Sequence, residues 1–423
     1  MKMKWNAAPI WGLVLACFAT SAGAAEGVNS PVPTAVKEVP VPVKVENLDK
    51  APIPKRLVLS NFVVEYQQRY EKKNTGFSLL GMGNAGSSKA VNDATLPDAS
   101  TLQAITNYAY LSTLQMLKAR GYEVVEVNKL SDKSRASYEK LSKTAPIQNG
   151  EVFSNIDGES VLYSPDGMVS SIPNAGCTHY GSEKTLANMA NNSRISGTGY
   201  QTEYENQIAN AEGKAPLLKV WITVGFGDAT ANGGNAFESA QQRDALGNTR
   251  TTVRNSANAN ATAGMYLKPE VTRFAIAMPT QTDYKTNHGC GMRLSKSTLL
   301  SPADGDAFIK LADRYHYDNS NVLSASSQAG SIAINDTAIG GGVGLRTVRE
   351  NSDGTQAGAA SNGNGVTLVN KGTQSSGRVD TTGYNTSINS VTEFATVISA
   401  DLYATSALSM IYKASNAFVS ALP

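Results

Sequence analysis

Apolar residues run together at four places in the chain in the manner of buried β-strands. Residues 56–66 are rich in Val, Leu, Phe and Tyr and predict the first strand of a folded body. Residues 122–127 predict a second strand, and residues 217–224 predict a strand with a buried face. Residues 273–278 have the same character, and we expect them to form a neighbour of strand 217–224 in one sheet.

The clearest helical pattern follows residue 100. Asp98 and Ser100 are candidate N-caps, and Gly121 stands where a helix often ends in the left-handed conformation. The spacing between them therefore predicts a long amphipathic helix. Its apolar positions are Leu102, Ile105, Ala109, Leu111, Leu114 and Leu117.

A second strong helix is predicted at the end of the sequence, over residues 400–422. Only Asp401 and Lys413 are charged there, so the helix is expected to pack on the body or on another subunit. Its apolar stripe consists of Ala404, Leu408, Ile411, Phe418 and Leu422.

Other segments complete the fold prediction. Further helices are expected at 131–143, 183–193, 201–211 and 303–315. Strand, helix and strand within one short run indicate an α+β or α/β class, in which a mixed sheet is flanked by helices.

Two long insertions break this pattern, at residues 225–264 and 326–386. Both are rich in Gly, Asn, Ser, Thr and Ala, yet they contain short alternating pieces that predict weakly hydrophobic β-hairpins. We expect exposed hairpins or loops that pair between subunits or line a channel. Entry into a membrane is the alternative, but a spanning strand needs about 9–11 residues with an apolar outer face, which none of these pieces sustains. The pieces are 249–253, 331–334, 343–348 and 365–369.

The beginning of the sequence resembles an export signal. Lys2 and Lys4 precede a short apolar run at 10–19, and small residues follow at 22–24. We therefore expect a signal peptide at 1–24. The alternative is lipidation at Cys17, although a bulky residue two positions before it fits a lipobox poorly.

Domain organisation follows from the prolines after the signal. Residues 25–54 are Pro-rich and predict an extended linker. Residues 55–423 are then expected to form one domain that carries the two insertions.

Composition narrows the classes of function. The chain has 423 residues, 41% of them hydrophobic, which excludes a wholly disordered protein. There are 37 basic and 35 acidic residues, and loss of the two basic residues in the signal leaves a mature charge of zero. A neutral chain without basic blocks is not expected to bind nucleic acid.

Cysteine and histidine residues suggest one covalent feature and one metal alternative. Cys177 and Cys290 remain after signal removal, and an even pair in an exported chain predicts a disulfide. His179 and His288 lie two residues from these cysteines, so the four side chains are an alternative ligand set for a tetrahedral metal. Two further alternatives stay open: a Cys177–His179 nucleophile pair and free thiols.

Motifs for catalysis are missing from the sequence. Residues 74–98 are rich in Gly, Ser and Asn and predict a loop. Within it, residues 81–86 match G-x-G-x-x-G, but they do not link a strand directly to a helix, so a dinucleotide site is not expected. His316 is expected to end the helix at 303–315 or to lie on the surface. We therefore predict a protein that is not an enzyme and has no cofactor.

Three stretches carry a family resemblance. Residues 55–66, followed by a loop and a helix that leads into 118–125, resemble the opening of periplasmic α/β domains in the curli-secretion-channel and TolB N-terminal class. Residues 220–224, followed by a Gly-rich hairpin, are similar to the way the curli channel family carries strands out of such a domain. The ending from residue 400 is similar to exported bacterial proteins with the same opening strand. The resemblance implies a role in assembly or in the cell envelope.

These expectations define one leading function and two alternatives. The leading one is a non-enzymatic exported envelope protein in the periplasm, outer membrane or cell surface, acting in assembly, secretion or structural support through self-association or an envelope protein partner. One alternative is a periplasmic small-molecule-binding protein or enzyme with a site between the body and the Gly-rich loops. The other is an adhesin-like surface protein.

Overall fold

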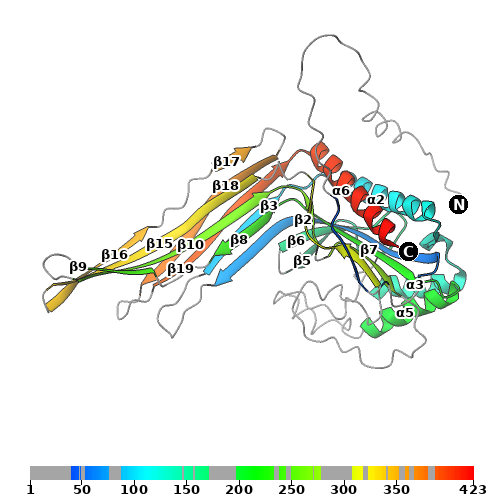
Figure 1. Ribbon diagram of the computed structural model, residues 1–423, viewed down its shortest axis with the longest axis horizontal. Helices are drawn as coiled ribbons and strands as arrows, with labels where there is room; N and C mark the ends of the chain where they lie inside the picture. The colour runs from blue at the N-terminus through cyan, green and yellow to red at the C-terminus, as the bar shows by residue number, and fades with distance from the viewer. Residues whose placement is uncertain are drawn as a thin grey trace, which may run out of the picture. The chain divides into compact units, whose positions relative to one another are not determined.

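Two sheets carry the fold, one of 14 strands and one of five (Figure 1). The computed structural model describes the following residues, of which those from Val41 onward belong to one compact unit: 40–46, 48, 53–75, 87–144, 147–155, 158–170, 197–232, 238–243, 249–269, 271–277, 307–317, 323–339, 342–351, 358–361, 366–379 and 386–423.

The main sheet is mixed, and its principal order is β1-β13-β12-β7-β2-β3-β19-β18-β17. These strands are β1 (Val43–Glu46), β2 (Arg56–Thr75), β3 (Ser87–Ala94), β7 (Leu217–Gly225), β12 (Arg273–Ala277), β13 (Ala307–Leu311), β17 (Gly358–Ser361), β18 (Val366–Val379) and β19 (Thr386–Ile398). Five shorter strands pair beside them: β4 (Glu123–Glu126), β5 (Glu151–Asn155), β6 (Gly158–Tyr163), β11 (Tyr266–Leu267) and β14 (Tyr315–His316).

The five-stranded sheet is built from the two insertions. Its order is β16-β15-β10-β8, and β9 pairs with β10 beyond the end of β8. Its strands are β8 (Asp228–Asn232), β9 (Glu238–Arg243), β10 (Thr249–Ala263), β15 (Leu323–Ile339) and β16 (Gly342–Asn351). All its pairs are antiparallel.

Helices lie on both faces of the body part of the main sheet (Figure 1). The helices α2 (Ala99–Ala119) and α6 (Ala400–Ala421) pack side by side, with Thr113 Oγ1 donating to Ser415 Oγ at 3.2 Å. The helices α3 (Asp132–Thr144) and α5 (Gly197–Ala211) pack together elsewhere, and a short 3-10 turn, η1 (Val127–Lys129), precedes α3.

Local sequence explains where the two long helices begin and end. Asp98 Oδ1 accepts the Thr101 N–H at 2.7 Å, and Gly121 has a φ of +80° directly after the last turn of α2. Ser399 caps α6 by accepting the Leu402 N–H at 3.4 Å. Both predicted long helices are thereby confirmed.

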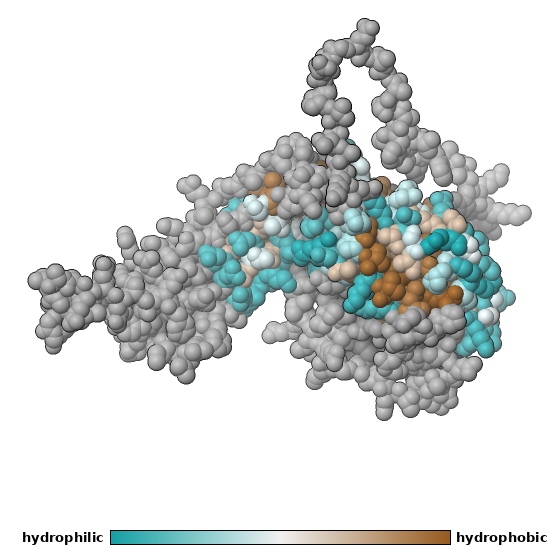
Figure 2. All heavy atoms as spheres, viewed as in Figure 1, coloured by the Kyte–Doolittle hydropathy of each residue, from teal (hydrophilic) through white to brown (hydrophobic). Residues whose placement is uncertain are grey.

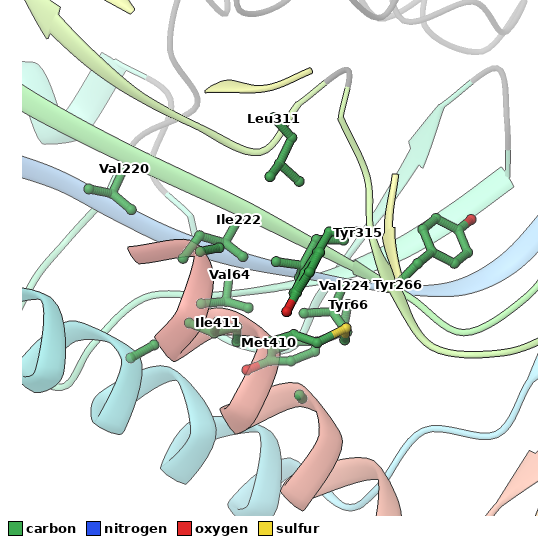
Figure 3. Packing of buried hydrophobic residues seen from close by; sticks show 14 of the residues in the cluster. Val64, Tyr66, Val220, Ile222, Val224, Tyr266, Leu311, Tyr315, Met410 and Ile411 are labelled. Carbon is green, nitrogen blue, oxygen red and sulfur yellow. The ribbon is translucent and has the colours of Figure 1, made fainter. Parts of the chain in front are cut away.

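The larger core lies between the main sheet and the pair α2–α6. Figure 3 shows Val64 of β2 and Ile222 of β7 packed against Ile411 of α6. Phe274 of β12 meets Phe418 edge-on, with ring centroids 5.1 Å apart. Burial of large apolar side chains at this density is the main source of stability for the body.

Several predicted elements are confirmed. The α+β class, the helices at 131–143 and 201–211, and the antiparallel neighbours 217–224 and 273–278 all appear. The described residues of the alternating pieces of both insertions lie inside long strands. The helix expected at 183–193 lies outside the described residues.

The helix predicted at 303–315 is wrong. Residues 307–311 form β13 instead, with Ile309 and Leu311 in the α6 core and Phe308 and Lys310 on the opposite face. Phe308, Leu311 and Tyr315 also satisfy a helical spacing, so the period of two was read as a period near 3.6. His316 therefore ends no helix and lies in β14.

Two predicted irregular segments contain strands. Residues 87–94 were expected in a loop, but they form β3, which pairs antiparallel with β2 and parallel with β19. Residues 43–46 were expected in the solvated linker, yet they pair with β13 as β1. In both cases the strand is completed by partners distant in sequence, which a local pattern does not show.

Among the described residues, no helix is long and apolar enough to cross a membrane.

Candidate interaction surface

The long strands of the two sheets lie against each other through small residues. The strands β8 and β10 bury alanines at alternate positions, and the Asn and Thr residues between them are exposed in β8 and half-buried in β10. These alanines belong to the same cluster as Leu368 of β18 and Phe394 of β19. The buried alanines are Ala229, Ala231, Ala259, Ala261 and Ala263.

Polar side chains of β3 join the two sheets. Ser88 Oγ donates to the Asn258 carbonyl at 3.2 Å. Asn92 Nδ2 donates to the carbonyls of Thr262 at 3.2 Å and Asp228 at 3.3 Å, and its Oδ1 accepts from Thr396 Oγ1 at 2.9 Å. Asn92 is fully buried, so these bonds satisfy groups that water does not reach.

The chain passes from the main sheet to the five-stranded sheet through Gly225 and Gly227. A Cβ on Gly225 would lie 2.6 Å from Tyr266 Cζ, and one on Gly227 would lie 2.8 Å from Asn92 Nδ2. Tyr266 Oη donates to the Gly227 carbonyl at 2.9 Å, and the Phe226 N–H donates to Tyr70 Oη. Glycine is required here because the tyrosine ring and Asn92 approach the backbone closely.

A charged pair completes this junction. Arg314 donates to Asp228 at 2.7 Å and lies over the Tyr266 ring, 4.6 Å from its centroid. His316 is half-buried beside the same ring, and burial together with the Arg314 charge lowers its pKa. The junction thus holds the root of the five-stranded sheet, residues 228–232 of β8 and 258–263 of β10, on the body.

Beyond the junction, the five-stranded sheet has open edges within the described part of the chain. In that part, β16 pairs only with β15, through residue 342 and residues 345–351, and β9 pairs only with β10. The register places Glu238 opposite Arg254 and Asp336 opposite Arg346. An edge strand presents backbone N–H and C=O groups that another strand can pair with.

The hydropathy of the side chains also differs between the body and the long strands. In Figure 2 apolar residues gather over the body, around β7 and the end of α6, whereas the described parts of the long strands are mostly hydrophilic on the visible face. The candidate interaction surface is therefore the open backbone edge of β16, together with the edge of β9 on the opposite side of the sheet.

A buried carboxylate lies on the face of the main sheet away from α2 and α6. Glu65 is 1% exposed and accepts from Ser160 Oγ at 2.6 Å, Trp221 Nε1 at 3.0 Å and Thr223 Oγ1 at 2.8 Å. Neutral donors from β6 and β7 hold it, and the described residues contain no cluster of metal-ligating side chains. We interpret Glu65 as a structural link between β2 and its neighbours.

The sequence singled out four cysteine and histidine residues as a candidate disulfide or metal site. Cys177, His179, His288 and Cys290 lie outside the described residues, as do Cys17 and residues 81–86. Sequence reasoning missed Glu65 and Asn92. For Glu65 the available signal was a charged residue inside a run that otherwise reads as a buried strand, whereas Asn92 lies among polar residues and gave no such signal.

Comparison with known proteins gives no relative. No family model, no curated protein and no solved structure matches the chain.

Proposed function

We propose that this protein is a non-enzymatic, exported envelope protein that acts in assembly, secretion or structural support by self-association. The observation that carries the proposal is the open edge of β16, ten residues long, on a sheet built largely from small and polar residues. Such strands bury little apolar area of their own, so an added strand is the available source of further stabilisation.

The mode of association follows from the topology of the five-stranded sheet. Its two long edges are β16 on one side and β8 with β9 on the other. Pairing of β16 in one copy with β9 in the next continues the sheet from copy to copy. This contact is head-to-tail, and it closes into a ring when the rotation between copies divides a full turn.

Proline at two adjacent positions of β16 tests the proposal. Successive N–H groups of a strand point to opposite sides. The two variants are Thr347→Pro and Val348→Pro, and each removes one N–H donor. One variant therefore loses a hydrogen bond to β15, and the other loses a donor at the open edge. The mature chain, 25–423, is measured by light scattering and thermal unfolding. One variant is expected to lose assembly with little change in Tm, and the other to lower Tm.

Deletion of residues 350–364 gives a second, coarser test. This segment contains the end of β16 and all of β17, which pairs only with β18 in the described chain. We expect the body to stay folded with an unchanged Tm while assembly weakens. Wild-type assembly in both proline variants, or a large loss of Tm in a monomeric deletion variant, contradicts the proposal.

A further inference from the structure

One nitrogen of a buried arginine lacks a hydrogen-bonding partner among the described residues. Arg273 is the first residue of β12 and is 7% exposed. Its Nη2 atom has no hydrogen-bond partner, and Arg273 forms no ion pair within the described part of the chain. Buried guanidinium groups are ordinarily paired with an acid or fully hydrogen-bonded, so this one requires an explanation.

The strand register fixes where Arg273 lies. It stands opposite Trp221 of β7 and Lys310 of β13, while its neighbour Phe274 packs in the core beneath α6. Since side chains alternate along a strand, Arg273 is on the face away from α2 and α6. Its Cζ is 5.6 Å from the centroid of the Phe308 ring on the same face. The aromatic ring supports one side of the guanidinium plane and supplies no hydrogen bond.

Charge around Arg273 is unbalanced among the residues that the structure describes. The near acid is Glu46, whose Oε1 already accepts Lys44 at 3.0 Å and Lys310 at 2.9 Å. These two lysines lower the pKa of Glu46. Burial lowers the pKa of Arg273 to about 10, and the Glu46 charge only partly opposes this effect. Three cations therefore lie near a single described carboxylate, which is in contact with only two of them.

We propose that Arg273, flanked by Lys310 and Lys44, binds a small oxyanion that carries a carboxylate or phosphate group. A guanidinium offers two parallel N–H donors that match the oxygens of either group. The oxyanion approaches the buried guanidinium from the side of the two lysines, because the side chains of Lys310 and Lys44 are 30% and 58% exposed. This site is independent of the open edge of β16 and does not rest on self-association.

Ligand-dependent unfolding of the mature chain tests the site. Tm is measured with sodium succinate and with inorganic phosphate in separate titrations at constant ionic strength, with chloride as the reference salt. A saturable rise of about 2 °C or more is expected with at least one oxyanion at a concentration well above its Kd. The two titrations distinguish a carboxylate ligand from a phosphate ligand.

Arg273→Met assigns the effect to this residue. The variant is expected to lose the oxyanion-dependent rise, and in chloride to unfold at the wild-type temperature or above, because it removes an unpaired buried charge. Lys133→Met, which removes an exposed cation on α3, is the matched control and keeps the rise. Arg273→Lys keeps the charge without the paired donors and should raise Kd about tenfold.

Three results overturn the proposal. One is the absence of a saturable rise in the wild-type chain with both oxyanions. Another is an unchanged rise in Arg273→Met, and the third is an unchanged Kd in Arg273→Lys.

Discussion

The body and the five-stranded sheet are stabilised in different ways. The body buries large side chains, such as Phe274 against Phe418, between the main sheet and two helices. The roots of β8 and β10 instead bury alanines, and polar residues such as Asn92 tie their backbone to the body. The body is therefore complete by itself, whereas the five-stranded sheet has backbone groups along β16 still open to another strand.

The largest expected effect is on the body core. Phe274→Ala should lower the free energy of unfolding by about 3–5 kcal/mol, since it leaves a cavity beside Phe418. The matched change among the buried alanines of β10 is Ala261→Gly, which should lower the free energy of unfolding by about 1 kcal/mol. Denaturant unfolding followed by a probe of the body measures both. Equal costs would abolish the proposed distinction between the two regions.

The next effect concerns the buried carboxylate. Glu65→Ala removes the acceptor for Ser160, Trp221 and Thr223, and should cost about 3 kcal/mol because buried donors lose their partner. Glu65→Gln keeps the shape and one acceptor oxygen, so its cost should be smaller. Chemical denaturation of the two variants provides the comparison, and a neutral Glu65→Ala would contradict a structural role.

The junction between the two regions should give a smaller, more local effect. Asn92→Ala removes the donors to the Thr262 and Asp228 carbonyls, at a cost of about 1–3 kcal/mol. Hydrogen exchange is expected to rise first in β8 and in the root of β10, with β2 unaffected near its pairing with β7. Asn258→Ala is the matched control, since Asn258 is exposed and only its backbone carbonyl meets Ser88. Uniform acceleration across β2 and β8 would show that the junction belongs to the body core.

The smallest effect is a pH dependence within the body. Burial alone would raise the pKa of Glu212, but hydrogen bonds from Ser134, from Ser131 and from Arg56 outweigh it, so the pKa is below the ordinary 4.5. A lowered folded-state pKa means that the ionised group stabilises the fold above pH 4.5 and that this contribution disappears as the pH falls further.

A substitution isolates this contribution. Glu212→Gln should lower the stability at pH 7 by about 1 kcal/mol, and the difference from wild type should shrink on acidification. Thermal unfolding at pH 7 and in steps below pH 4.5 measures this. A difference that stays constant with pH would contradict the assignment.

Local signals predicted the body better than the edges of the sheets. The helix α2 could be predicted because its cap, apolar stripe and terminal glycine all lie within one stretch of sequence. The strands β1 and β3 could not, because β13 and β19 are remote partners and the residues of β1 and β3 are few or polar. The strand β13 was read as a helix because its apolar residues satisfy two periods at once.

The candidate surface was predicted only in outline. The alternating pieces of the insertions indicated hairpins, but their pairing into one sheet with β16 at its edge depends on register between β10, β15 and β16. Arg273 gave no local signal either, since its isolation depends on which residues of β7 and β13 lie opposite.

Hydrogen exchange along β16 tests self-association most directly. Exchange of residues 342–351 is followed in the mature chain over a wide range of protein concentration, with β7 of the body as the internal reference. If copies pair through this edge, amides of β16 that point away from β15 become protected as concentration rises, while β7 is protected throughout. Exchange of those amides that is fast and independent of concentration, in a chain that stays monomeric, would contradict the account.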